Sequence, residues 1–446
     1  MKSHVKVLPL LLGTVVILLA VCRSAAGQET GRLEAYLEIA RAENPEIRAA
    51  GEAVEAARAR ARAAGLLPDP QLGVGLVNAL VSEPLSSEDF MTMRMVQVDQ
   101  RLPYPGKLGL ERQIAAWELS AAEAERERVE LEVTAAVKRA YYEIYFLDRA
   151  REVVNHNHEL LADFVRITQA RYGVGTGAQP DVLKAQVEKS RLGYELVELA
   201  ERRTAAIARL NALFARSSID PVAAPAIPED VERAALPERG TPVRFTAAAL
   251  GAAEDGGPIP DLAILQARAE NQSPVIRAHV ARIEAQKAAL RLAEKAALPD
   301  FDVSFGYGQR GGREDMITAM VSIPIPVRKG PRQDALAAGE RSELAEQQAL
   351  HHSMVHDLHA EVAELHASLV RTRDRLALLR EGVLPQARAS LESAVAGYPV
   401  ASVDFLTLID NQATLFRHEL DYHRLLADFA ADLAELERVV GGEVLQ

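Results

Sequence analysis

The stretch LGLERQIAAWELSAAEAERERVELEVTAAVKRAYYEIYFLDRAREVVNHNHELLADFVRITQAR, residues Leu108–Arg171, predicts one unbroken helix. It contains no proline and, after Gly109, no glycine, and it is rich in Ala, Glu, Leu and Arg, which are strong helix formers. Roughly 65 residues at about 1.5 Å each make a rod of about 100 Å, whereas ordinary globular helices are near a dozen residues long. A second stretch, Pro331–Gly397, has nearly the same length and texture, with interruptions at Gly382 and Pro385. Two such rods in one chain indicate a protein that spans a distance.

The charge balance of the 446 residues is acidic, with 51 basic against 63 acidic side chains and a net charge of −12. This argues against a nucleic-acid-binding protein, which needs a basic surface for the phosphate backbone. The sequence contains neither a phosphate-binding loop nor a Gly-x-Ser-x-Gly motif. Its carboxylates are spread along predicted helix faces rather than paired. We therefore expect no enzyme activity and no cofactor.

The first residues are typical of a secretory signal peptide, which we place at 1–27. Lys2 and Lys6 supply positive charge, Leu8–Val21 is almost wholly apolar, and Ser24–Gly27 offers small residues suited to cleavage. The apolar run is short for a membrane-spanning helix. The sequence therefore predicts an exported protein.

Cys22 is the only cysteine, which excludes an internal disulfide. It follows Leu19-Ala20-Val21 at the end of the apolar run, and this arrangement resembles a lipoprotein cleavage site at which Cys22 becomes the lipidated first residue. The alternative is that Cys22 is discarded with the signal peptide.

The mature chain uses one plan twice, and each half consists of helix, strand, strand, long helix, turn and shorter helix. The junction Leu67-Pro68-Asp69 recurs as Leu298-Pro299-Asp300, and the turn at Tyr172 recurs at Tyr398. We predict a first repeat at 28–216, a proline-rich linker at 217–260 and a second repeat at 261–446. The predicted elements are strands at about 71–78 and 90–102, helices at 108–171 and 180–215, strands at about 301–309 and 316–325, and helices at 331–396 and 403–440.

The predicted strands alternate between apolar and polar or small residues. The alternation is clearest at 301–308, where Phe, Val, Phe and Tyr alternate with Asp, Ser, Gly and Gly. A period of two predicts a half-buried strand, and it is also the pattern of a lipid-facing barrel wall. A barrel in lipid must close, and known membrane barrels begin at about eight strands. Strands that span a membrane here would have to share a barrel among several copies, and strand counting allows a dimer or a trimer.

The chain resembles the outer-membrane factors of the TolC family over almost all of its mature length. The resemblance rests on the duplicated plan, the turns at Tyr172 and Tyr398, and the segment Val403–Gln412. The joint Gln100–Lys107 is similar to one common in the heavy-metal branch of that family.

This resemblance implies a mainly α-helical fold with a β portion: a homotrimer with a shared barrel in outer-membrane lipid and a coiled-coil helical tunnel in the periplasm. It implies that a periplasmic adaptor docks on the turns at Tyr172, Gly173, Tyr398 and Pro399, and that a resistance–nodulation–division pump supplies the energy. The implied function is a passive efflux conduit, with heavy-metal cations as the favoured substrate. The alternatives are a type I protein secretion conduit and a periplasmic coiled-coil scaffold.

The resemblance also implies a constriction at the tunnel tip, where acidic side chains form a ring. Asp410 matches one family acid by position, Thr407 replaces the other, and Asp404 lies one turn earlier. Asp181 and Lys184 occupy the related places in the first half. Asp is also a good helix N-cap, so capping is the alternative for Asp404 and Asp181.

Two groups of side chains suggest metal binding. His352, His356 and His359 are spaced i, i+4, i+7 on one predicted helix face, where imidazoles can bind zinc or copper. They also flank an apolar seam, so the alternative is a solvent-facing or helix-facing flank. The methionines at 91, 93 and 95 alternate along a predicted strand, either as soft copper ligands or, as we favour, as lipid-facing side chains.

Overall fold

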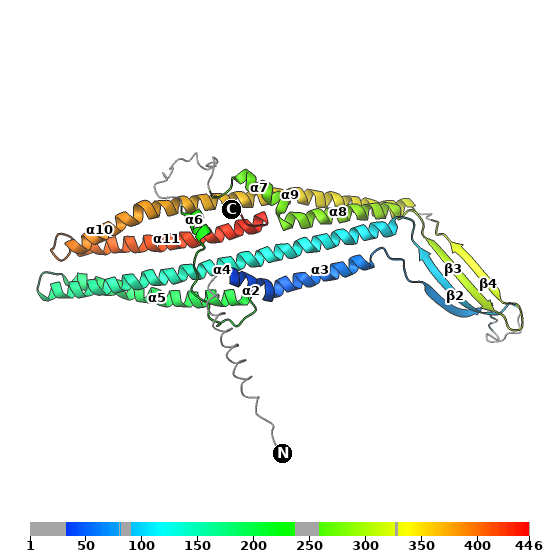
Figure 1. Ribbon diagram of the computed structural model, residues 1–446, viewed down its shortest axis with the longest axis horizontal. Helices are drawn as coiled ribbons and strands as arrows, with labels where there is room; N and C mark the ends of the chain where they lie inside the picture. Colours follow the sequence, from blue (N-terminus) through cyan, green and yellow to red (C-terminus); the bar gives the residue numbers. More distant parts are fainter. Residues whose placement is uncertain (1–32, 80, 82–90, 237–257, 326–328, 446) are drawn as a thin grey trace, which may run out of the picture. The chain divides into compact units, whose positions relative to one another are not determined.

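The computed structural model describes residues 33–79, 81, 91–236, 258–325 and 329–445, which are mostly helical with one β-sheet (Figure 1). The predicted fold class, mainly α with a β portion, is confirmed. The predicted signal peptide and Cys22 lie outside the described residues. The elements are α2 (Leu33–Glu43), α3 (Pro45–Ala63), β1 (Gln71–Val77), β2 (Met93–Leu102), α4 (Lys107–Gly173), α5 (Gln179–Leu213), α6 (Glu229–Ala235), α7 (Leu262–Gln272), α8 (Pro274–Lys295), β3 (Phe301–Gln309), β4 (Met316–Ser322), η2 (Lys329–Asp334), α9 (Ala335–Leu378), η3 (Leu379–Val383), α10 (Leu384–Gly397) and α11 (Phe405–Val440).

The chain forms two compact units. Among the described residues, unit 1 comprises 33–49, 128–236, 258–273 and 357–445, and unit 2 comprises 50–79, 81, 91–127, 274–325 and 329–356. Each unit draws on both halves of the sequence, so the two repeats fold together rather than as successive domains. The 67-residue helix α4 is continuous and contributes to both units. Within the described residues, none of the helices combines the length and the apolarity that crossing a membrane would take.

Unit 2 contains an antiparallel sheet with the strand order β1-β2-β3-β4. Val98 pairs with Leu72 on one side and Phe305 on the other, and Val303 pairs with Val321. Two strands are shorter than predicted by three residues each: β2 begins at Met93 rather than at 90, and β4 ends at Ser322 rather than at 325. Proline at 324 explains the second difference, because it has no N–H to donate to a strand ladder. The outer edges of β1 and β4 have no partner strand within the described residues.

The second long helix, predicted as one element at 331–396, begins with one π-helical segment, η2, and is divided by a second, η3. The observed order is η2, α9, η3 and α10. Pro385 lies in the first turn of α10, directly after η3. Since proline has no N–H and its ring clashes with the carbonyl group four residues earlier, a wider π-turn is the local adjustment that keeps the helix going.

The proline-rich segment predicted as a linker at 217–260 contains a helix, α6, and its described residues are part of unit 1. The backbone N–H groups of Ala223 and Ala226 donate to the hydroxyl oxygens of Tyr36, at 3.2 Å, and Tyr141, at 3.0 Å. Tyr36 also stacks on Phe214 with ring centroids 5.6 Å apart. The tyrosine hydroxyl groups thus satisfy backbone donors that an irregular segment would otherwise leave unpaired. Residues 237–257 are outside the described part of the chain.

Helices α4 and α11 run antiparallel in unit 1 and are joined by polar contacts along their length. Lys138 Nζ lies 2.5 Å from Glu437 Oε2, and Arg424 Nη1 lies 2.6 Å from Glu143 Oε2. Further along, buried Gln412 donates to Asn157 at 2.8 Å. A buried amide pair is satisfied in only one alignment, so this contact fixes the register between the two helices.

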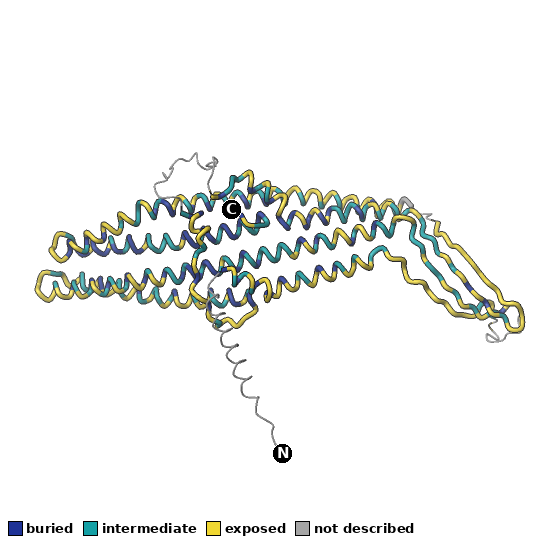
Figure 2. The backbone as a smooth tube through the Cα atoms, viewed as in Figure 1, coloured by how far each residue is buried: buried dark blue, intermediate teal, exposed yellow. Residues whose placement is uncertain are grey.

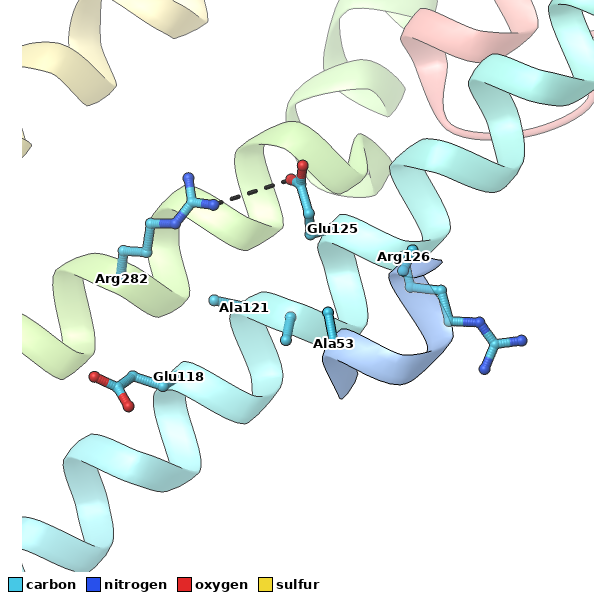
Figure 3. A pocket seen from close by; sticks show the side chains of 8 residues that line it. Ala53, Glu118, Ala121, Glu125, Arg126 and Arg282 are labelled. Atoms are coloured by element: carbon cyan, nitrogen blue, oxygen red, sulfur yellow. Dashed lines mark ion pairs between the residues drawn. The ribbon is translucent and has the colours of Figure 1, made fainter. Parts of the chain in front are cut away.

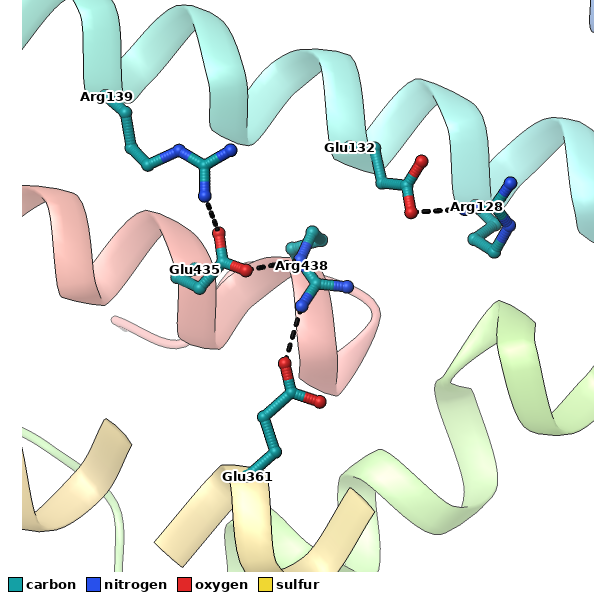
Figure 4. A network of polar contacts seen from close by, with 6 residues as sticks. All are labelled: Arg128, Glu132, Arg139, Glu361, Glu435 and Arg438. Carbon is teal, nitrogen blue, oxygen red and sulfur yellow. Dashed lines mark hydrogen bonds and ion pairs between the residues drawn. The ribbon is translucent and has the colours of Figure 1, made fainter. Parts of the chain in front are cut away.

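A second polar network ties α9 to the same helices (Figure 4). Arg438 lies between Glu435 at 2.7 Å and Glu361 of α9 at 2.6 Å, and Glu435 also pairs with Arg139 of α4 at 2.7 Å. The network is half-buried, where ion pairs are less screened than at the surface. It joins three helices that come from different parts of the chain.

Candidate functional site

One face of the sheet is apolar and exposed. Paired residues of neighbouring strands point to the same side, which places valine, leucine, isoleucine and aromatic side chains of all four strands together. Val74 is 76% exposed, Ile317 68% and Phe305 54%. Figure 2 shows this exposure along the strands. An apolar face of this size needs an apolar partner, and it matches the lipid-facing wall predicted from the alternation. It consists of Leu72, Val74, Leu76, Val96, Val98, Val303, Phe305, Tyr307, Ile317 and Val321.

The opposite face carries small and polar residues. Gly73 pairs with Gln97, Gln97 with Gly306, and Gly306 with Thr318. Gln97 Nε2 donates to Asp99 Oδ1 at 2.6 Å, so this face forms its own polar contacts. Apolar residues on one side and small polar residues on the other are the inside-out pattern of a membrane sheet with an aqueous interior.

Met93 and Met95 lie on this small-residue face and not on the apolar face, so the preference for lipid-facing methionines was wrong at these two positions. Met91 precedes β2. Met95 pairs with Gly308 and Gly75, whereas the apolar side chains of β2 are those of Val96 and Val98. The alternation shows that Met93 and Met95 share a face, but it does not show which one. The register with the glycines of the other strands decides it.

The joint between the sheet and α4 is held by one lysine. Lys107 Nζ donates to Leu298 O and to Asp300 Oδ1, both at 2.8 Å, and Asp300 Oδ1 also accepts from the Tyr104 N–H at 2.9 Å. Partial burial alone would raise the pKa of Asp300, but these hydrogen bonds and the lysine charge outweigh it and lower the pKa. Gly106, at φ +92°, makes the turn. The joint thus ties the two repeats together where the sheet meets the helices.

The first hairpin turn, between α4 and α5, closes on the carbonyl group of Arg171. This oxygen accepts from the N–H groups of Thr176 at 2.9 Å and Gly177 at 3.0 Å. Gly175 has φ +74°, a conformation that favours glycine. Tyr172 and Val174 are exposed at the turn.

The second hairpin turn, between α10 and α11, has the same plan but a buried tyrosine. Tyr398 is only 3% exposed and packs on Phe405 with ring centroids 5.6 Å apart. Burial, followed by the nearby charge of Asp181, raises the pKa of Tyr398. Val400 and Pro399 are exposed, so each turn presents a small apolar surface.

Arg171 joins the two turns. Its guanidinium group lies over the Tyr398 ring at 4.5 Å and donates to the Tyr398 carbonyl oxygen and, at 3.2 Å, to that of Thr176. Among the described residues the Tyr398 hydroxyl has no hydrogen-bond partner. The contact between the hairpins therefore depends on the arginine, the ring face and the backbone, not on the phenol oxygen.

Of the residues predicted at the tunnel tip, one caps a helix and the others do not. Asp404 is the N-cap of α11 and accepts from the Thr407 N–H at 2.7 Å, which lowers the pKa of Asp404. Asp181 is not a cap: Ala178 holds the N-cap position of α5, and Asp181 follows it in the first turn. Lys184 is exposed on α5. Thr407 and Asp410 are exposed on α11, at one helical spacing from each other.

The predicted histidine group gains no support as a metal site. His352 and His356 are exposed, and His359 Nε2 lies 3.7 Å from Glu270 Oε2. The described residues contain no group of three His, Cys, Asp or Glu side chains arranged to hold a metal ion. Sequence reasoning missed His279, which is buried, bonded to Gln347 O at 3.0 Å and stacked on His351.

Unit 2 also contains a shallow hollow of about 310 Å³ between α3, α4 and α8 (Figure 3). Alanines line it, and Arg282 lies 4.0 Å from Glu125 at its rim. The alanine surface suits close packing of a helix better than binding of a small molecule.

The exposed apolar sheet face, its outer edges without a partner strand among the described residues, and the long helical hairpins define the class of protein, a membrane-inserted one. The family model described as Outer membrane efflux protein matches residues 36–216 and 265–442. The chain therefore belongs to the outer membrane efflux protein family. It is an outer-membrane transport protein with a periplasmic helical part, and not an enzyme.

Relatives agree with this family over nearly the whole chain. The cobalt-zinc-cadmium resistance protein CzcC of Cupriavidus metallidurans is 24% identical over 431 residues, which cover 94% of this chain and 91% of CzcC. The outer membrane protein VceC of Vibrio cholerae has a TM-score of 0.74 at 18% identity, covering 92% of this chain and 96% of VceC. CusC, whose structures concern transmembrane channel formation, has a TM-score of 0.74 at 14% identity and covers 92% of each chain. The predicted resemblance is confirmed.

Proposed function

We propose that this chain is the outer-membrane channel subunit of a tripartite efflux system and that it works as a homotrimer exporting heavy-metal cations. The exposed apolar sheet face with two open edges carries the proposal. In lipid an open sheet edge leaves backbone groups unsatisfied, so β4 of one copy must pair with β1 of the next. Three copies of the four-stranded sheet would close a barrel of about twelve strands. The periplasmic scaffold alternative is set aside by the family.

A stripe of exposed apolar residues on α5 supports assembly. Leu183, Val187, Tyr194 and Val197 are all more than half exposed, and their spacing places them on one side of the helix. An apolar stripe on a long helix is the surface that a neighbouring helix covers in a bundle. We assign it to the contact between copies.

The hairpin turns are the proposed docking and gating region. Their exposed apolar residues, among them Tyr172 and Pro399, offer the surface for a periplasmic adaptor, and the contact of Arg171 with Tyr398 keeps the hairpins together. Asp410 would line the tunnel, where three copies gather like charges that attract cations.

Metal export is supported by the similarity to CzcC, a cobalt-zinc-cadmium resistance protein, and by the similarity of the joint Gln100–Lys107 to the heavy-metal branch. The test is growth of a strain that lacks this chain, with and without a plasmid copy, on rising zinc, cobalt or cadmium. We expect metal sensitivity that the wild-type copy restores. Unchanged metal tolerance with loss of a secreted protein would overturn metal efflux in favour of type I secretion.

A further inference from the structure

We propose that the small-residue face of the sheet is a binding surface for soft monovalent cations, Cu(I) or Ag(I), through the thioether sulfurs of its methionines. The surface consists of Met93, Met95, Met316 and Met320, and we refer to it as the thioether shelf. The inference rests on the proposed function for its role in export, because only a shared barrel turns this face into the wall of a passage.

The distribution of methionine is the first observation. The chain has 7 methionines, and apart from Met1 and Met354 all lie at 91–95 and 316–320. Methionines used as apolar filler against lipid would lie on the apolar face. Within the described strands they lie instead on the opposite face, where Met95 and Met316 are in register with glycine, Met320 with Ser304 and Met93 with Val77.

The glycines of β3 are the second observation, because they leave room for the sulfur atoms. A Cβ placed on Gly308 would lie 2.6 Å from Met93 Sδ, and one placed on Gly306 would lie 3.4 Å from Met95 Sδ. The two thioether groups therefore lie across β3 where no side chain covers the strand. From the other side Gly308 pairs with Met316, so sulfur-bearing side chains approach the same glycine from both neighbouring strands.

Access is the third observation. Met316 is 42% exposed and Met320 53%, so this side of the shelf is open. A thioether is neutral and soft, and it selects Cu(I) over hard or borderline divalent ions. Several weak ligands on an open wall would raise the local cation concentration and still release the ion, as a conduit requires.

Silver titration of the purified mature protein in detergent tests the shelf. Silver nitrate in chloride-free buffer is the probe, with heat as the readout. We expect saturable binding that becomes at least about tenfold weaker when all four shelf methionines are changed to leucine, which keeps volume and removes sulfur. Met354→Leu, in α9, is the matched control and should bind like the wild type. Absence of binding in the wild type, or equal binding by the four-leucine variant, would overturn the proposal.

Two further controls address silver binding by histidine side chains and misfolding of the four-leucine variant. At a pH of about 5 most imidazoles are protonated while thioethers are unchanged, so shelf binding should persist there. Methyl resonances of ¹³C-labelled methionine in the folded wild type should shift on silver addition for the shelf and not for Met354. This readout holds even where the four-leucine variant folds poorly, and shifts confined to Met354 would contradict the shelf. If the four-leucine variant loses silver binding but still restores zinc tolerance to the strain, the shelf is supported independently of the proposed function, and the failure of one proposal can be told from the failure of the other.

Discussion

Lys107 shows how much one side chain can hold together at a sheet-to-helix joint. Its ammonium group and the Tyr104 N–H meet the same carboxylate oxygen of Asp300, so strand, turn and helix from both repeats converge on one oxygen atom. Sequence comparison within the chain found the recurring Leu-Pro-Asp junction, but the interaction across 193 residues is visible only in the structure.

Asp300→Asn tests the joint. The variant keeps an acceptor and loses the charge, and we expect a loss of about 1 kcal/mol, the scale of a charge-assisted hydrogen bond relative to a neutral one. Because the folded-state pKa of Asp300 is lowered, its contribution is present above the unfolded pKa of about 4 and is lost as the pH falls through the folded pKa. The unfolding midpoints of the two proteins should therefore differ at neutral pH and converge at strongly acidic pH. Asp302→Asn, which breaks a more exposed pair with Arg101, is the control, and an equal loss there would contradict the assignment.

Arg171 connects the two hairpin turns, as Lys107 connects the elements at the sheet-to-helix joint. Arg171→Ala removes the ring contact and the hydrogen bonds to two carbonyl oxygens, and we expect the open fraction of the channel to rise about tenfold, equivalent to about 1.4 kcal/mol. Tyr398→Phe should change little, because the hydroxyl has no partner among the described residues. Planar bilayer conductance measures both, and a stronger effect of Tyr398→Phe would refute this account.

At the scale of elements, periodicity predicted most of what is local. The helix predicted at 108–171 is α4 at Lys107–Gly173, because composition alone supports an uninterrupted helix. The π-segments around α9 were not predicted: Pro385 marks the place, but whether proline ends, kinks or widens a helix depends on packing around it. The face on which Met93 and Met95 lie depends on the strand register, which residues of the neighbouring strands set. Asp181 does not cap α5 because the helix begins earlier than predicted.

The exposed stripe on α5 gives the prediction at this scale. Changing Val187 and Val197 to Asp places charges on the proposed contact between copies, and we expect the oligomer to dissociate in detergent, since burying an unpaired carboxylate costs several kcal/mol. Gel filtration with light scattering measures the mass. Changing exposed Ser342 and Ser353 of α9 to Asp adds the same two charges and should leave the oligomer intact. Dissociation by both would mean that general charge, not the stripe, sets assembly.

At the scale of the whole molecule, strand counting allowed a dimer or a trimer, and the family resemblance favours the trimer. Native mass spectrometry of the detergent-extracted protein should give three copies of a chain of at most 48.5 kDa, and removal of the predicted signal peptide would lower that mass. Two copies would imply an eight-stranded barrel and would overturn the trimer. The number of copies is invisible to periodicity, because it depends on curvature and on contacts between chains.

The outer edges of β1 and β4, which have no partner strand among the described residues, also affect how the chain behaves before it is inserted into the membrane. A single newly exported copy carries two open strand edges and a broad apolar surface in water, which is a template for edge-to-edge aggregation. Correct pairing with sister copies and wrong pairing use the same backbone groups. During biogenesis, assembly of the oligomer therefore competes with aggregation. Overproduction of the chain would favour aggregation unless chaperones cover each copy until it assembles.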